Sequence, residues 1–336
     1  TVLSYVAYLK DDLDIQLYPS NVKRHWLYYD QFSKNCFKRL FQRIHNHVYP
    51  KLCKFLICFQ KYDTAIAAQE GMYADFVNKY VHANKKLLWI HNDMSLCHWT
   101  KQYFGDIKNE ITCYKEFDYI VCVSEDVKKS MIDTFGIMNN LVVRYNPIDT
   151  NEIEKKKMEF IIQHPSSPLF VAVGRLVKQK GYDRLLNICK KLRDDGYDFY
   201  VWILGDGEER ANLEYLISEK KLTQVTLLGN QKNPFPYMHI ADWVICTSRH
   251  EGFNMVLHEA VWCGTPIITT NNAGAHELLG DNKYGIITEN DDEAFYNVLK
   301  KVLTDPSIAT FYRKAVARRR NFIEIEERIE KIEELL

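Results

Sequence analysis

Cationic and glycine residues gather where the C-terminal half of the sequence passes from an apolar run into an amphipathic stretch. The segment GRLVKQKG, residues 174–181, brings Arg175 and Lys180 to the start of a predicted helix. Cationic side chains, exposed main-chain amides and the helix dipole together favour a phosphate or pyrophosphate at such a place. We therefore expect a diphosphate-binding loop here, and the alternative is a pair of solvated surface cations.

A second turn, Gly205-Asp206-Gly207, follows the next apolar run. A dinucleotide-binding fingerprint would need a third glycine at position 210, where the sequence has Arg210. The turn therefore argues against a nicotinamide cofactor. Taken alone, it is equally explained as a tight turn with glycine at a positive φ.

Two glutamates, Glu251 and Glu259, stand eight residues apart in EGFNMVLHEAVWCG. In a helix, eight residues are a little over two turns, so both carboxylates share one side about 12 Å apart along the axis. Such a pair can hold two ends of one extended polar ligand. Leu257, Ala260 and Val261 flank Glu259, and a carboxylate in apolar surroundings needs a polar partner. The alternative is a carboxylate at a helix N-terminus plus a solvated glutamate.

Short apolar runs alternate with amphipathic stretches from about Leu169 onward, which is typical of parallel strands covered by helices on both faces. The first half shows weaker strand-then-turn units such as KKLLWIHND and DYIVCVSED. We predict an α/β fold with two Rossmann-like, doubly wound domains facing a central cleft. The opening stretch TVLSYVAYLK is predicted to be helical.

The predicted domain boundaries follow from composition. An N-terminal domain, incomplete at its start, covers residues 1–150, and a C-terminal domain covers 151–315. Residues 150–168 have the charged, then Pro- and Ser-containing composition of a connection. Residues 316–336 form a helix with charged side chains on its outer face, predicted to pack back on the N-terminal domain.

Composition excludes several classes of protein. Lys plus Arg (44) equals Asp plus Glu (44) among 336 residues, so overall charge gives no reason to expect a nucleic-acid partner. The 9 cysteines are odd in number and lack a C-x-x-C pair, which favours reduced thiols in a cytoplasmic protein over disulfides or a zinc site. No apolar run approaches the roughly 18 to 20 residues of a membrane span, and no signal peptide is expected.

Four motifs occur in this order along the chain: NPID at 146–149, then GRLVKQKGYDRLL, ILGDGEERANLE and the segment from LLGNQKNPFPYM to EGFNMVLHEAVWCGTPIITT in the C-terminal half. In order and spacing they resemble the retaining GT-B glycosyltransferases of family four. The likeness is greatest to the bacterial branch that builds capsule, exopolysaccharide and lipopolysaccharide.

The resemblance implies roles for individual residues. Arg175 and Lys180 would bind the donor diphosphate, and Glu259 would accept hydrogen bonds from the ribose. Glu251 and the main-chain amides of residues 253–256 would hold donor-sugar hydroxyls and a phosphate oxygen, while the main chain of 229–238 would read uracil. The implied donor-binding set is Gly174, Gly205, Asp206, Gly207, Asn230, Asn233, Pro234, Gly252, Phe253, Asn254, Met255, Val256 and Glu259.

The resemblance also points to His91 in WIHND as a residue that reaches a donor-sugar hydroxyl near the reacting carbon. The alternative is a packed or surface histidine. The family's usual first strand and glycine-rich loop are not visible before TVLSYVAYLK, which puts part of the acceptor site in doubt. The implied catalytic set is His91, Arg175, Lys180 and Glu251.

The expected reaction needs no metal and no cofactor beyond the UDP-sugar substrate. Departure of UDP develops negative charge on the diphosphate, which Arg175 and Lys180 would stabilise. Retention implies that the acceptor attacks from the side the nucleotide leaves; Glu251 as a covalent nucleophile is the alternative. The DxD-like run Asp11–Asp14 is interpreted as a solvated turn.

A local positive charge suggests a membrane surface as a partner. Residues 21–61 contain nine Lys or Arg against one acid, Asp30. Apolar residues at helical spacing within 34–54 predict a basic amphipathic helix, which favours peripheral contact with anionic lipid. The alternative is a helix whose apolar stripe packs on the domain core.

We therefore expect transfer of a hexose or N-acetylhexosamine from a UDP-sugar to a lipid-linked or saccharide acceptor in bacterial surface polysaccharide synthesis. Two alternatives remain open at this point. One is an isomerase similar to the UDP-sugar 2-epimerases of the same fold, and the other is a non-catalytic subunit that binds nucleotide-sugar.

Overall fold

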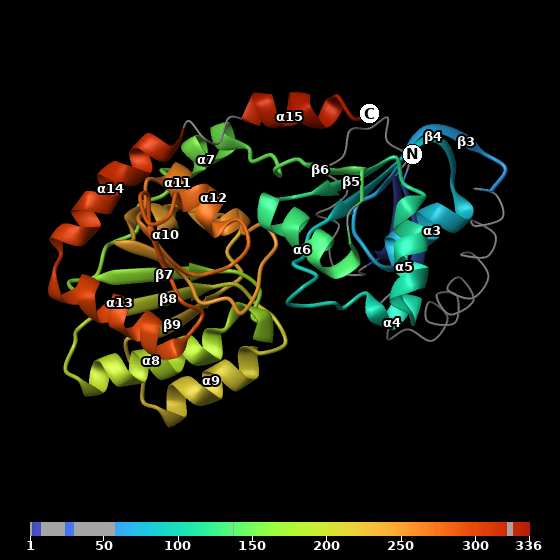
Figure 1. Ribbon diagram of the computed structural model, residues 1–336. Coiled ribbons are helices and arrows are strands. Elements are labelled where there is room, and N and C mark those ends of the chain that lie inside the picture. Colours follow the sequence, from blue (N-terminus) through green and yellow to red (C-terminus); the bar gives the residue numbers. More distant parts are fainter. Residues whose placement is uncertain (1, 8–23, 30–57, 137, 321–324) are drawn as a thin grey trace, which may run out of the picture. The chain divides into compact units, whose positions relative to one another are not determined.

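The computed structural model describes residues 2–7, 24–29, 58–136, 138–320 and 325–336 (Figure 1). Side chains are described from residue 58 onward, apart from 137 and 321–326. The DDLD run at Asp11–Asp14 and the basic helix predicted over 34–54 lie outside these residues. Within the described part of the chain, no helix is long and apolar enough to cross a lipid bilayer.

The chain divides into two compact units. One comprises Thr1–Trp89 and Thr100–Ile120, and the other comprises Ile90–Trp99 and Val121–Leu336. The predicted boundary near residue 150 remains a prediction.

The larger unit contains a six-stranded sheet with the order β12-β11-β10-β7-β8-β9, and all its strand pairs are parallel. Its strands are β7 (Leu169–Val173), β8 (Tyr200–Leu204), β9 (Val225–Gly229), β10 (Trp243–Cys246), β11 (Ile267–Thr270) and β12 (Ile286–Thr288). The order reverses at β7, because β8 and β10 flank it on opposite sides. This arrangement confirms the predicted doubly wound, parallel α/β architecture.

Helices cover both faces of this sheet, with α8 and α9 on one side and α10 and α11 on the other (Figure 1). The helices and the 3-10 turn η1 are η1 (Lys178–Lys180), α7 (Thr150–Lys156), α8 (Tyr182–Asp194), α9 (Arg210–Glu219), α10 (Phe235–Ile240), α11 (Met255–Cys263), α12 (Ala275–Leu279), α13 (Asp292–Thr304), α14 (Ser307–Arg319) and α15 (Ile325–Glu333).

The alternation of side chains along β7 explains the two-sided burial. Phe170 and Ala172 enter a core shared with α8 and α13. Leu169 and Val171 enter another core shared with α7, α11 and α14. Successive strand residues point to opposite faces, so a strand buried on both faces is apolar at every position. The apolar run in the sequence therefore fixes β7 in the centre of the sheet.

Two further groups of strands lie outside the six-stranded sheet. β1 (Val2–Ala7) pairs in parallel with β2 (Arg24–Tyr29), and a second sheet has the order β3-β4-β5-β6. Its elements are β3 (Lys61–Ala67), α3 (Met72–Tyr80), β4 (His82–Ile90), α4 (Lys101–Phe104), α5 (Ile107–Lys115), β5 (Tyr119–Cys122), α6 (Glu125–Phe135) and β6 (Leu141–Val143).

The prediction of an opening helix is wrong over Val2–Ala7, which form β1. β-Branched and aromatic residues fit a pleated strand better than a helix. Parallel pairing of Val2 with Arg24 extends the ladder to Ala7 and Tyr29. A nonlocal partner therefore decides the conformation of a stretch whose own pattern is ambiguous.

The segment predicted as a connection, 150–168, begins with a helix. Asp149 caps α7, because its carboxylate accepts a hydrogen bond from the main-chain N–H of Glu152 at 2.8 Å. Ile153 is buried in the core shared with α11. Asp149 and Ile148 belong to the NPID motif, so this motif helps to anchor the start of α7.

Candidate active site

Two of the predicted loops pack back to back at the carboxyl ends of β7 and β8. The main-chain N–H of Gly174 donates to Leu204 O at 2.9 Å. Gly205 has φ +142°, and a Cβ there would lie 1.9 Å from Gly174 O. Glycine is therefore required at position 205 because two backbones meet there.

The Gly205-Asp206-Gly207 turn continues this contact. The Leu176 N–H donates to Asp206 O at 2.9 Å, and a Cβ on Gly207 would lie 2.5 Å from Leu176 O. The Asp206 side chain is exposed and accepts from the Gly207 N–H at 2.8 Å. The glycines thus serve loop-to-loop packing, which goes beyond the tight turn that the sequence alone suggested.

The structure joins Lys180 and Glu251 in an ion pair. Lys180 Nζ lies 2.6 Å from Glu251 Oε1, and the two side chains are only 17% and 8% exposed. Ser248 Oγ donates to the same carboxylate oxygen at 2.6 Å. The predicted diphosphate cation and the predicted sugar-binding carboxylate therefore lie side by side, which places both at one point of the site.

Arg175 is placed differently from Lys180. Its side chain is exposed and makes no hydrogen bond or ion pair with the residues that the structure describes. Lys180 ends η1, and Gly181, with φ +67°, leads into α8. A Cβ at Gly181 would lie 2.2 Å from Thr247 O, so the loop of Lys180 rests directly on the loop of Glu251.

A small hollow lies at the carboxyl ends of β7 and β10 and includes predicted site residues. Asn254 directly precedes α11, and its Nδ2 lies 3.0 Å from Cys246 Sγ. Met255, the first residue of α11, is partly buried. The hollow is lined by Val173, Lys180, Tyr182, Ile245, Cys246, Thr247, Ser248, Asn254 and Val256. It is lined by the loops that follow β7 and β10 and by the elements next to them, and it lies at the N-terminus of α11, a place that favours an anion.

Gly252 lies against the main chain of His91, and both residues belong to the larger unit. A Cβ on Gly252 would lie 1.7 Å from His91 O. Ser124 Oγ donates to Gly252 O at 3.1 Å. His91 follows directly on β4, at the carboxyl end of that strand, as predicted. Glycine at 252 is therefore needed for a close approach of two loops.

The side-chain amide of Asn233 is used within the fold. Its Nδ2 donates to Lys156 O at 2.9 Å and to Glu159 Oε2 at 2.6 Å, and its Oδ1 accepts from Phe235 N–H at 3.1 Å. Asn233 thus ties the start of α10 to the end of α7, whereas Asn230 is exposed and Pro234 precedes α10. A role of this segment in reading the base would fall to its main chain.

Glu259 is a partly buried carboxylate on α11. Burial raises its pKa from 4.5 to about 7. It accepts no hydrogen bond and forms no ion pair with the described residues. A partly buried carboxylate without such a partner is suited to accept hydrogen bonds from the hydroxyls of a ligand. These hydrogen bonds would stabilise the charged form, which burial destabilises.

This pKa predicts a pH-dependent stability. Because the folded pKa exceeds the unfolded one, wild-type stability falls as pH rises from about 4.5 to about 7, by at most about 3 kcal/mol. The variant Glu259→Gln should lose this dependence, so its free energy of unfolding relative to that of wild type should increase toward pH 8. Urea unfolding at pH 5, 7 and 8 measures the effect, with exposed Glu289→Gln as the control. Parallel pH profiles of wild type and Glu259→Gln would contradict the prediction.

Sequence reasoning missed a stack of rings behind the Glu251 loop. Phe253 stacks on His258, with centroids 4.1 Å apart, and on Tyr145, at 6.0 Å. The Arg328 guanidinium lies over both the Tyr145 and Phe253 rings, at 5.2 and 5.8 Å. Arg328 also donates to Asn146 O at 2.9 Å.

The prediction that the charged residues of the C-terminal helix face outward is wrong for Arg328. This residue is 5% exposed, and burial lowers its pKa to about 10. Burial is also the main cause that lowers the pKa of His258 to about 3, so its ring is neutral at ordinary pH. Contacts of Arg328 with two rings offset part of its desolvation. The only sequence signal was the NPID motif, which begins next to Tyr145.

Residues 154–324, more than half of the chain, match the family model for glycosyl transferases group 1. The chain therefore belongs to this family of glycosyltransferases, which confirms the resemblance found in its motifs.

Two curated relatives match about three fifths of their own length. The N-acetylgalactosamine-N,N'-diacetylbacillosaminyl-diphospho-undecaprenol 4-alpha-N-acetylgalactosaminyltransferase of Campylobacter jejuni is 31% identical over 232 residues, 67% of this chain and 62% of the relative. The lipopolysaccharide core biosynthesis glycosyltransferase LpsE of Rhizobium meliloti is 26% identical over 208 residues, 61% of this chain and 60% of the relative.

Among solved structures, Anabaena HepE in complex with UDP and glucose superposes with a TM-score of 0.72 at 18% identity. The match covers 98% of this chain and 90% of HepE. At this identity it shows the fold, and it confirms the predicted GT-B class.

Proposed function

We propose that the protein is a retaining glycosyltransferase in bacterial surface polysaccharide synthesis. It moves a hexose or N-acetylhexosamine from a UDP-sugar to a lipid-linked or saccharide acceptor. The observation that carries the proposal is the Lys180–Glu251 ion pair, 2.6 Å long, in a chain of the group 1 glycosyltransferase family. A partly buried cation beside a carboxylate that would hold sugar hydroxyls suits the departure of a diphosphate from a sugar.

The charges of the reaction suggest how this site would work. As the bond between the anomeric carbon and the phosphate oxygen breaks, negative charge grows on the diphosphate and positive character on the sugar. Lys180 would turn from Glu251 toward the phosphate, and exposed Arg175 would close on it from solvent. Preorganised cations that meet developing charge lower the barrier directly. Glu251 would then hold sugar hydroxyls, and a phosphate oxygen would take the proton of the attacking acceptor hydroxyl.

The relatives support the donor and acceptor classes. HepE was solved with UDP and glucose, and the name of the Campylobacter relative contains a diphospho-undecaprenol acceptor. The GNQKNPFPYM segment and the two glutamates favour UDP for this chain. We expect calorimetric titration to give tighter binding of UDP than of GDP, and tighter binding of GDP would contradict the donor assignment.

A turnover assay tests the proposal as a whole. UDP-sugars are supplied with a lipid-diphosphate-linked acceptor, and free UDP and the anomeric configuration of the product are followed. Retained configuration and activity in EDTA are expected, since Lys180 and Arg175 would neutralise the diphosphate in place of a metal. UDP-sugar interconversion without acceptor would favour an epimerase, and UDP-sugar binding without any turnover a non-catalytic subunit. Loss of activity in EDTA that Mn²⁺ or Mg²⁺ restores would contradict metal independence.

Peripheral association with an anionic membrane through residues 34–54, on the cytoplasmic side, is part of the proposal. It is supported by the basic amphipathic pattern of the sequence and by the lipid-linked acceptor named for the Campylobacter relative.

A further inference from the structure

The loops that carry Lys180 and Glu251 are connected by hydrogen bonds outside the ion pair itself. The Arg249 N–H donates to Gln179 O at 2.8 Å, and Gln179 Nε2 donates to His250 O at 2.9 Å. Thr247 Oγ1 lies 3.1 Å from the main-chain oxygens of both Lys180 and Gly181. The two loops therefore form one unit, and the separation of their side chains depends on how this unit is held.

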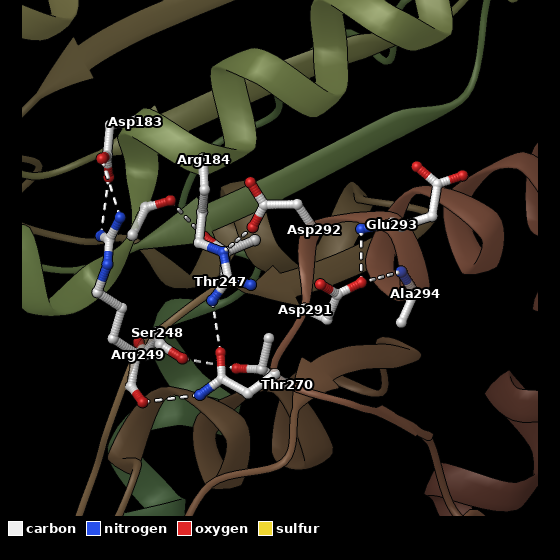
Figure 2. A network of polar contacts seen from close by, with 12 residues as sticks. Asp183, Arg184, Thr247, Ser248, Arg249, Thr270, Asp291, Asp292, Glu293 and Ala294 are labelled. Carbon is white, nitrogen blue, oxygen red and sulfur yellow. Dashed lines mark hydrogen bonds and ion pairs between the residues drawn. The ribbon is translucent and has the colours of Figure 1, made fainter. Parts of the chain in front are cut away.

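Arg249 is the side chain that holds the two loops together from outside. Its two terminal nitrogens, Nη1 and Nη2, each lie 2.9 Å from one carboxylate oxygen of Asp183 (Figure 2). Nη1 also donates to Lys178 O at 2.7 Å. Asp183 comes three residues after Lys180, and Arg249 comes two residues before Glu251. The planar, forked guanidinium group of Arg249 therefore fixes both the distance and the orientation between Arg249 and Asp183, which a single ammonium group cannot do.

A second arginine, Arg184, supports the main chain at Arg249 through Asn290. Arg184 is 7% exposed, and its Nε donates to Asp292 Oδ1 at 2.6 Å (Figure 2). Its Nη1 donates to Asn290 Oδ1, while Asn290 Nδ2 donates to Arg249 O at 2.7 Å. The start of α13 thus holds the main chain of Arg249 in place, so the guanidinium of Arg249 reaches Asp183 from a fixed base.

The charge state of this pair is stable near neutrality. Burial alone would raise the pKa of Asp183, but the hydrogen bonds and charge of Arg249 outweigh burial and lower it. The same partner raises the pKa of Arg249. Both groups are therefore ionised over the working range of pH.

We propose that Asp183 and Arg249 form a positioning pair that sets the separation of Lys180 and Glu251 at the donor site. The proposal rests on the proposed transfer reaction, since it concerns how the site meets a leaving diphosphate. Neither residue needs to touch the donor. When the fork is lost, the two loops can shift by a fraction of an ångström, and misplacement on this scale costs far more in turnover than in ground-state binding.

The test uses three variants of the full chain: Arg249→Gln, Asp183→Asn and the double variant. We expect kcat to fall about 10- to 50-fold in each, with UDP affinity within about twofold of wild type and the unfolding temperature within about 3 °C. The double variant should be no worse than either single variant, because both remove the same interaction. Arg249→Lys keeps the charge without the fork and should recover only part of kcat.

A matched control comes from α8, which carries Asp183, and α13, which carries Asp292. Lys191 and Glu293 form an exposed ion pair between α8 and α13, with a 2.6 Å contact. Glu293→Gln should leave kcat unchanged. Wild-type kcat in Arg249→Gln, or a loss of kcat matched by equal losses of UDP affinity and stability, would overturn the proposal.

Amide hydrogen exchange separates this proposal from the proposed function. Peptides covering residues 176–181 and 247–252 should exchange faster in Arg249→Gln and Asp183→Asn, and at the wild-type rate in Glu293→Gln. This readout needs no sugar transfer. If the wild-type protein transfers no sugar, the proposed function fails, but amide exchange in these peptides still tests the positioning role of Asp183 and Arg249. Wild-type exchange rates in both Arg249→Gln and Asp183→Asn would overturn that positioning role.

Discussion

Replacing Lys180 with alanine is expected to lower kcat by roughly 10² to 10³. The reason is that the cation contributes most when charge develops on the leaving diphosphate, so the loss should exceed the loss in UDP affinity. Steady-state kinetics and UDP calorimetry measure the two quantities. Turnover at the wild-type rate would show that the GRLVKQKG loop does not serve the diphosphate.

The same substitution should also reduce stability, because it leaves the buried carboxylate of Glu251 without its cation. Removing one member of a buried ion pair can cost about 3 kcal/mol. The double variant Lys180→Ala/Glu251→Gln is the control for this effect, since it removes both charges. Its unfolding free energy should recover most of the loss, which would show that the unpaired charge of Glu251 causes the instability of Lys180→Ala.

Replacing Gly205 with alanine is expected to destabilise the protein by about 3 to 5 kcal/mol. A side chain at its φ of +142° is strained, and the added Cβ would lie 1.9 Å from Gly174 O. The loops after β7 and β8 would have to separate. We expect the unfolding temperature to fall by about 10 °C and UDP binding to weaken, as measured by calorimetry.

Gly196→Ala is the matched control for this glycine. Gly196 has φ +85°, and an added Cβ would meet no atom within 4 Å. Its substitution should cost only about 1 to 2 kcal/mol, from the left-handed backbone alone. Equal losses in the two variants would mean that the close approach of the loops contributes nothing.

The pattern of apolar runs in the sequence predicted the doubly wound, parallel sheet of the larger unit. Every residue of LFVAV is apolar because β7 is buried on both faces, and this property is local enough to read from the chain. The glycines at 174, 205 and 207 also pointed to loops at the carboxyl ends of the strands. The motifs identified the glycosyltransferase family for the same reason, since each motif is a continuous segment.

The packing of distant segments determines which of these side chains meet, and the sequence patterns did not predict these contacts. Lys180 and Glu251 are 71 residues apart, and Arg328 reaches Asn146 across 182 residues. The side-chain amide of Asn233 donates a hydrogen bond to the end of α7. Val2–Ala7 form a strand because they pair with β2. Such contacts depend on how distant segments pack, and a pattern of residue types within one segment carries no information about its partner. The sequence therefore predicted which chemical groups each loop carries. The fold is what brings these loops together into one site.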